Sequence, residues 1–273
     1  MRFLKFLPAL LIVASTSFSS TVDESTKRFI YEITTPGVGR GTGFVINDSL
    51  LGYVLVTCKH VVQDKKGNYV DSILVRQNKL LSTGEAISDT NQFVIRLRVD
   101  GRLYLAEHPN PNVDLIMIPF LDFNIATPQD QYIVGLRSHF VLSKDLINKL
   151  GINEGTDVEL IGFSLSSSLS WERAHYHFSR FGKVGLFTTD EFTLVVDSVP
   201  RTANYILLDM STRPGDSGSP IFAHMGENSY LIGFLSARSE VMEFGIGYPV
   251  YYLYDLMKII RDKFSAVLEK QKK

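Results

Sequence analysis

The chain has little of three features that would assign it to particular classes of protein. Cys58 is the only cysteine among 273 residues, so an intrachain disulfide and a multi-cysteine zinc or iron–sulfur site are both excluded. Its 28 basic residues are balanced by 29 acidic ones, which argues against a dedicated nucleic-acid-binding protein. After residue 20, no apolar run approaches the ~20 residues that a membrane-spanning helix needs. These absences indicate a globular protein whose stability comes from its hydrophobic core.

The first twenty residues differ in character from the rest of the chain. Arg2 and Lys5 precede an apolar run from Phe6 to Ala14, and small polar residues follow. This order is typical of a secretory signal peptide. A membrane anchor is the alternative, but nine apolar residues interrupted by a proline are too few to span a bilayer. We therefore predict a signal peptide over residues 1–20, cleaved near residue 19 or 20, and a secreted or periplasmic protein with no stable membrane insertion.

Most of the remaining chain has the composition and spacing of β-strands. Short runs rich in Val, Ile, Leu, Phe and Tyr alternate with Gly, Asn and Asp at 41–47, 53–57, 72–76, 113–120, 158–163, 192–197, 205–210, 220–223 and 230–236. Alternation on both sides of Asp100-Gly101 predicts a β-hairpin with a two-residue turn. A short helix is expected at 143–150, with Ser143 as its N-cap and Gly151 beyond its end.

Only the C-terminal segment has the periodicity of a long helix. Apolar residues recur there at three- and four-residue spacings between Tyr252 and Glu269, which predicts an amphipathic helix packed against the body of the protein. About a dozen strands and one closing helix predict an all-β protein with two small antiparallel barrels. We expect the first barrel at about 28–122, the second at about 155–250 and the helix at about 252–269.

The sequence GDSGSP at residues 215–220 is the strongest indication of function. A serine hydroxyl is a poor nucleophile until a base takes its proton, and the oxyanion that forms needs fixed hydrogen-bond donors. Gly215 lets the backbone turn so that its own amide and that of Ser217 can face one point and form an oxyanion hole. The alternative interpretation is a simple turn between two strands, since Gly, Asp, Ser and Pro all favour turns.

His60 and Asp114 are the candidate base and its partner. His60 follows the strand-like run at 53–57, and Asp114 opens the apolar run that ends at residue 120. An aspartate in such a place is often only a turn residue, but this one could fix the histidine tautomer and stabilise its imidazolium form. Cys58, two residues before His60, is a competing nucleophile. Its apolar neighbours favour a buried and unreactive thiol instead.

Together these residues resemble the chymotrypsin-like (trypsin-like) serine proteases, in a disulfide-poor bacterial form without an appended peptide-binding domain. The order His60, Asp114, Ser217 is the order of that family's triad. The resemblance covers residues 29–262 and includes GTGF (41–44), TCKHV (57–61), VDLIMI (113–118) and RPGDSGSP (213–220). It implies two six-stranded barrels with the triad at their seam. It also implies a serine endopeptidase that acts on polypeptide substrates through an acyl-enzyme, with no cofactor and no metal.

The resemblance also implies where a substrate would bind. The family forms the floor of the pocket for the residue before the cleaved bond six residues before the nucleophile, here at Ser211. The opposite wall would be formed by Phe234, Leu235 and Ser236. Because Ser211 is not acidic, we expect no strong preference for Lys or Arg. Small or medium apolar side chains are expected in this pocket unless Arg238 enters it.

One departure from the digestive members of the family concerns activation. The expected mature start has no activation sequence. In the digestive enzymes, a freed amino terminus pairs with the acidic residue before the nucleophile. The corresponding residue here, Asp216, therefore needs another partner. We therefore expect no proteolytic activation. Three alternatives remain: a catalytically silent homologue that acts as a binding module, an esterase-like hydrolase, and metal binding by His175 and His177, which have no evident third ligand nearby.

Overall fold

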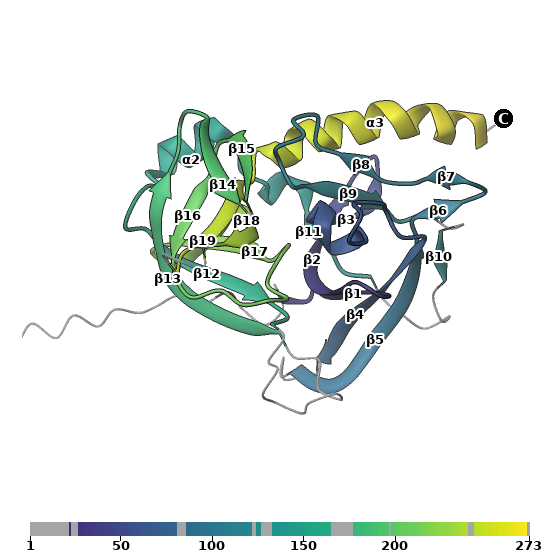
Figure 1. Cartoon of the computed structure of the whole chain (residues 1–273), viewed down its shortest axis with the longest axis horizontal. Coiled ribbons are helices and arrows are strands. Elements are labelled where there is room, and N and C mark those ends of the chain that lie inside the picture. Colours follow the sequence, from purple (N-terminus) through teal and green to yellow (C-terminus); the bar gives the residue numbers. More distant parts are fainter. Residues whose placement is uncertain are drawn as a thin grey trace, which may run out of the picture.

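The computed structural model contains two β-rich lobes and a C-terminal helix (Figure 1). It describes residues 22, 27–80, 86–121, 124–126, 133–164, 177–196, 198–239 and 243–271. We call residues 27–126 the first lobe and residues 157–250 the second lobe. Among the described residues, no helix is long and apolar enough to cross a membrane. The predicted signal peptide and its cleavage site lie outside the described residues.

The first lobe is built on a nine-stranded sheet, of which eight strands lie within the lobe and the ninth, β11, comes from the segment between the lobes. Its order is β10-β5-β4-β1-β2-β3-β9-β8, and β11 pairs with β2 in parallel. The turn between β2 and β3 is closed by Asp48, whose Oδ1 accepts from the amides of Leu50 and Leu51 at 3.0 and 3.1 Å, as Asp favours in turns. The strands are β1 (Ile30–Thr35), β2 (Gly39–Asp48), β3 (Gly52–Thr57), β4 (Ser72–Leu80), β5 (Ala86–Arg96), β8 (Ala106–Glu107), β9 (Ile116–Pro119), β10 (Ile125–Ala126) and β11 (Leu136–Arg137).

The second lobe is a closed barrel of six strands in the order β12-β13-β16-β19-β18-β17. Closure leaves the barrel without a free sheet edge. A separate hairpin of β14 and β15 is inserted between β13 and β16. The strands are β12 (Asp157–Gly162), β13 (Phe178–Phe187), β14 (Phe192–Val196), β15 (Val199–Ala203), β16 (Ile206–Asp209), β17 (Pro220–Met225), β18 (Asn228–Arg238) and β19 (Gly245–Pro249).

The all-β architecture is confirmed, with two differences of detail. In the described residues, the first lobe is an open sheet that ends at β8 and β10, two strands of two residues each. Only the second lobe closes into a barrel. The hairpin at Asp100-Gly101 is present, with φ of 49° and 73° at its two turn residues. Its strands, β6 (Arg98–Val99) and β7 (Arg102–Leu103), form a small sheet of their own instead of extending β5.

The helices begin and end close to where the sequence predicts. Helix α2 (Lys144–Leu150) is capped by Ser143, whose side chain accepts from the Leu146 amide, and it ends at Gly151 with a φ of 68°. Two 3₁₀ turns, η1 (Lys59–Val62) and η2 (Ser138–Phe140), also precede the second barrel. Helix α3 (Tyr252–Gln271) leaves the second lobe and packs on β8 and β9 of the first (Figure 1).

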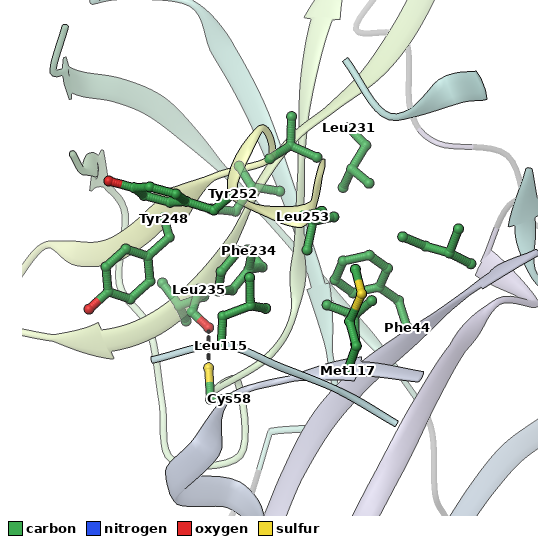
Figure 2. Close-up of a cluster of buried hydrophobic side chains, with 14 of the residues drawn as sticks. Phe44, Cys58, Leu115, Met117, Leu231, Phe234, Leu235, Tyr248, Tyr252 and Leu253 are labelled. Carbon is green, nitrogen blue, oxygen red and sulfur yellow. Dashed lines mark hydrogen bonds between the residues drawn. The ribbon is translucent and has the colours of Figure 1, made fainter. Parts of the chain in front are cut away.

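Hydrophobic side chains from both lobes and from α3 meet in a common core. Figure 2 shows Phe44, Leu115 and Met117 of the first lobe beside Leu231 and Phe234 of the second. All of these side chains are almost fully buried. Burial of large apolar side chains contributes roughly 1.5–3 kcal/mol each, so this shared core stabilises the contact between the lobes. The two lobes therefore present their strand ends to each other in a fixed arrangement.

Candidate active site

His60 and Asp114 lie side by side at the edge of the first lobe. His60 is in η1, directly after β3, and Asp114 comes just before β9 instead of opening that strand. Because β3 pairs with β9, the two residues are brought together. Nδ1 of His60 lies 2.6 Å from Oδ2 of Asp114, and the His60 amide donates to Oδ1 at 3.3 Å. A proton held on Nδ1 by this carboxylate leaves Nε2 as the proton acceptor.

The Asp114 carboxylate is buried and satisfied by hydrogen bonds. Besides His60, it accepts a hydrogen bond from the Ser236 hydroxyl at 2.7 Å. Burial acts to raise the pKa of Asp114, but the charge of His60 and the hydrogen bonds from His60 and Ser236 together lower it well below its usual range. A carboxylate that stays charged orients the imidazole and stabilises its protonated form. Ser236, predicted only as a pocket wall, also anchors this carboxylate.

Ser217 lies in a tight loop between two glycines with left-handed backbone conformations. Gly215 has a φ of 95° and Gly218 a φ of 88°, which residues with a Cβ adopt only at a cost. A Cβ on Gly218 would also lie 1.9 Å from the carbonyl oxygen of Thr42. Within the described part of the chain, the amides of Gly215 and Ser217 donate to no backbone carbonyl. The prediction that these two amides form an oxyanion hole stays a prediction, and the Ser217 hydroxyl donates to the Ser236 carbonyl at 3.1 Å.

Thr42, in the GTGF segment of β2, joins the Ser217 loop to the first lobe. Its amide donates to the Ser217 carbonyl at 2.8 Å, and its hydroxyl donates to the Gly215 carbonyl at 2.8 Å. The same hydroxyl accepts from the Phe163 amide of the second lobe at 2.9 Å. Sequence reasoning used GTGF only as a sign of resemblance and missed this role. The pattern contains no signal for it, since Thr42 and Gly215 are 173 residues apart.

Asp216, which was expected to need a partner other than a freed amino terminus, is paired with Arg180. The carboxylate is 1% exposed, and its Oδ2 lies 3.0 Å from Nε of Arg180 on β13. Oδ2 also accepts from the Arg213 amide at 2.7 Å, and Oδ1 accepts from the Ser164 hydroxyl at 2.5 Å. A buried carboxylate needs such a cation and hydrogen bonds. Because Arg180 supplies the charge from an internal strand, Asp216 is compensated without a freed amino terminus.

A cavity of about 200 Å³ opens beside Ser217, with His60 and Asp114 in its lining. The predicted wall residues Leu235 and Ser236 also line it. Ser211, the predicted floor, lines a second cavity of about 230 Å³.

Phe234 does not take the place predicted for it. Its side chain is fully buried in the core, with its ring centroid 5.7 Å from that of Tyr248 (Figure 2). The strand alternates, so β18 presents Leu235 and Phe234 to opposite sides. Three arginines also line the cavity beside Ser217: Arg201, Arg213 and Arg238. Of these, the sequence analysis considered only Arg238 as a residue that could enter the pocket.

Cys58 is close to the acid–base pair but has the character of a core residue. The ligand atoms of Cys58, His60 and Asp114 lie within 4.8 Å of one another. The thiol is fully buried and donates to the Leu235 carbonyl at 3.3 Å (Figure 2). Burial, followed by the charge of Asp114, raises the pKa of Cys58 well above its usual value. A nucleophile or a metal ligand must be a thiolate, so this setting favours a neutral, unreactive thiol.

The sequence suggested metal binding only at His175 and His177. His177 packs its ring at 6.3 Å from that of Phe163. His175 lies outside the described residues, so this hypothesis stays a prediction.

Sequence comparison agrees with the geometry of this site. Residues 41–233 match the trypsin-like peptidase domain, and the chain therefore belongs to the trypsin-like peptidase family. No curated protein sequence matches it significantly.

Solved structures with the same fold include three proteases. The Rv3671c protease of M. tuberculosis in its active form is 16% identical, with a TM-score of 0.52 over 86% of this chain and 81% of that chain. The thermostable serine protease AL20 from an extremophilic microorganism is 10% identical, with a TM-score of 0.52 over 84% and 95%. A Glu endopeptidase is 15% identical, with a TM-score of 0.51 over 85% and 90%. At such identities the likeness shows a shared chymotrypsin-like fold.

Proposed function

We propose that this protein is an exported serine endopeptidase with Ser217, His60 and Asp114 as its catalytic triad. One observation carries the proposal: the His60 ring, 2.6 Å from the buried Asp114 carboxylate, lines the same cavity as Ser217. Membership of the trypsin-like peptidase family supports hydrolysis of polypeptides. The chemistry lies in side chains and backbone amides, so it needs no cofactor.

The reaction proceeds through an acyl-enzyme in two halves. Ser217 Oγ attacks the carbonyl carbon of the peptide while Nε2 of His60 accepts its proton, and Asp114 stabilises the resulting imidazolium. The amides of Gly215 and Ser217 donate to the oxyanion as it forms. His60 then gives its proton to the amine nitrogen, the carbon–nitrogen bond breaks and the amine leaves. Water repeats the sequence on the ester and frees Ser217.

Labelling with a fluorophosphonate, which reacts with an activated serine, tests this assignment. We expect covalent modification of the wild-type protein at Ser217 and none in Ser217→Ala. The control is Ser229→Ala, because Ser229 is exposed on β18 and bonds only His224 among the described residues. A folded wild-type protein that stays unlabelled would instead be a silent homologue. Turnover of matched ester and amide substrates distinguishes a peptidase from an esterase.

Export is the second part of the proposal and rests on the amino-terminal pattern alone. Arg2 and Lys5, the apolar run and the small residues after it support a signal peptide cleaved near residue 19 or 20. Amino-terminal sequencing of the protein recovered outside the inner membrane should begin near residue 20. Material that still begins MRFLK would overturn export by this route and leave the triad assignment untouched.

A further inference from the structure

The cavity beside Ser217 is lined by more positive than negative side chains. Arg201, Arg213 and Arg238 contribute three guanidinium groups, and Asp114 contributes the one carboxylate. That carboxylate accepts hydrogen bonds from His60 and Ser236. Without counting His60, three positive charges and one negative charge leave an excess of two positive charges around the cavity.

The three arginines reach this cavity from three different elements. Arg201 is on β15, Arg213 is in the loop before Ser217, and Arg238 ends β18. The backbone around Arg201 is held in place, since its carbonyl accepts from the Tyr205 hydroxyl at 2.8 Å and the next residue, Thr202, accepts from Asn110 Nδ2 of the first lobe at 3.3 Å. Burial has the largest influence on the pKa of Asp114 and raises it, and Arg201 is among the groups that lower it. Its charge therefore acts inside the site.

Arg238 lies at the boundary between two cavities. Arg238 and Thr212 line both the cavity beside Ser217 and the neighbouring one, whereas Ser211 and Glu243 line only the neighbouring one. The floor predicted at Ser211 therefore belongs to the neighbouring cavity and not to the one beside Ser217. The acidic Glu243 also lines only the neighbouring cavity.

We propose that this cavity selects an acidic side chain, Asp or Glu, on the substrate residue whose carbonyl Ser217 attacks. The inference rests on the proposed function and replaces the sequence-based expectation of a small or medium apolar side chain. Guanidinium groups bind carboxylates through paired, charge-assisted hydrogen bonds. A Lys or Arg side chain in the same cavity would meet like charges, so the expected weakness of Lys and Arg as substrates is kept.

The test uses peptides with one sequence, blocked at both ends, in which only this residue is changed to Glu, Asp, Gln, Leu or Lys. Blocked ends leave the side chain as the sole source of the carboxylate. We expect kcat/KM for Glu to exceed that for Gln by at least about tenfold, as one charge-assisted hydrogen bond gives. The ratio should fall in 1 M salt, where the Debye length shrinks to ~3 Å.

Two variants of one residue connect this preference to the cavity. Arg238→Gln, which leaves an excess of one positive charge, should lower the Glu/Gln ratio, and Arg238→Glu, which leaves two positive and two negative charges, should bring the ratio close to one. The matched control is Arg102→Gln, since Arg102 is exposed on β7 and lines neither cavity. A Glu/Gln ratio near one in the wild-type protein, or a ratio that Arg238→Gln leaves unchanged, would overturn the proposal.

Binding to Ser217→Ala separates this inference from the proposed function. The variant keeps the cavity but lacks the nucleophile, so it measures selection of the peptides without turnover. Tighter binding of the Glu peptide than of the Gln peptide by Ser217→Ala supports acidic recognition even if the wild-type protein shows no turnover. Equal binding of the two, together with wild-type turnover, leaves the peptidase assignment intact and overturns the acidic preference.

Discussion

The two lobes hold their parts of the candidate site by different means. In the first lobe, His60 and Asp114 are positioned by their own side chains and by the pairing of β3 with β9. In the second lobe, Ser217 is positioned by backbone hydrogen bonds around it and by the ion pair between Asp216 and Arg180. The contact between His60 and Asp114 is therefore made inside one lobe, and the second lobe adds only the hydrogen bond from the Ser236 hydroxyl to Asp114. The geometry of the nucleophile instead depends on both lobes, because Thr42 of the first lobe holds two carbonyls of its loop.

The largest expected effect comes from removing one indispensable group from either lobe. Ser217→Ala and His60→Ala should each lower kcat by about 10⁶, and the double variant should be little worse, since such residues act as a unit. Steady-state turnover of folded variants checks this, with circular dichroism as the control for folding. If folded Ser217→Ala cleaved peptides at a near wild-type rate, the equal dependence on both lobes would be refuted.

The next largest effect is expected from breaking a buried ion pair, compared with breaking an exposed ion pair on the same strand. Arg180→Ala leaves Asp216 charged and buried, and we expect a loss of about 3–5 kcal/mol in the free energy of unfolding. Displaced oxyanion donors should also lower kcat by roughly 10²–10³. The matched control is Lys183→Ala on β13, whose partner Asp157 lies at 2.6 Å with both side chains more than half exposed, and this pair should contribute ~0–1 kcal/mol.

Further measurements on Arg180 variants distinguish a role in positioning Ser217 from a general loss of stability. For a positioning residue, Arg180→Lys should recover part of kcat, and Arg180→Ala should slow fluorophosphonate labelling of Ser217 at temperatures where the variant is folded. Equal effects of Arg180→Ala and Lys183→Ala would contradict the role of the buried pair.

A smaller loss of stability and of kcat is expected when the hydrogen bonds of Thr42 between the lobes are removed. Thr42→Val keeps the shape of the side chain but removes the partner of the Gly215 carbonyl and of the Phe163 amide. Each buried group left without a partner costs about 1–3 kcal/mol, measurable as a lower denaturant midpoint, and kcat should fall with it. Thr193→Val removes only an exposed hydroxyl pair and should change stability by less than ~0.5 kcal/mol. Equal stability of the two variants would show that Thr42 does not couple the lobes.

The stability of the folded protein should fall gradually in acid as Asp114 becomes protonated. The pKa of Asp114 is held below the ~3.9 of an unfolded aspartate, so the folded protein binds this proton more weakly than the unfolded chain does. The stability that Asp114 contributes is therefore present above about pH 4 and is lost as pH falls further. Asp114→Asn should flatten this dependence in a pH series of thermal unfolding midpoints. A wild-type curve with the same shape as that of Asp114→Asn would contradict it.

Cys58 should give the smallest effect on catalysis. Because its thiol is buried and neutral, a thiol reagent should react only after denaturant is added. Cys58→Ser can still donate to the Leu235 carbonyl, and kcat/KM should change by less than about twofold, within the ±0.5 kcal/mol of a neutral substitution. Rapid inactivation of the native protein by thiol alkylation would instead make Cys58 part of the site.

The sequence was sufficient for features carried by local patterns. Strand periodicity, the Ser143 cap and the stripe of apolar residues after Tyr252 predicted elements that the structure contains. The sequence suggested His60, Asp114 and Ser217 as candidates because each has a recognisable local setting and the three follow the order of the family's triad. Their meeting in one cavity depended on the resemblance, since nothing in their spacing specifies it.

The sequence was insufficient where a contact joins distant segments. Arg180 and Asp216 are 36 residues apart and on different elements, and no periodicity links them. Arg201 enters the cavity only because the β14–β15 hairpin folds toward the first lobe. Phe234 was misplaced because an apolar residue beside a pocket and one in the core have the same appearance in a sequence.

The contacts of Thr42 also determine when during folding the nucleophile can take shape. Its hydroxyl bonds Gly215 across 173 residues of chain, and contacts of such sequence separation close late because the entropy of the intervening loop must be overcome first. During synthesis, a chain of fewer than 217 residues already contains His60 and Asp114 but lacks Ser217. We therefore expect the loop around Ser217 to be among the last parts of the molecule to be assembled.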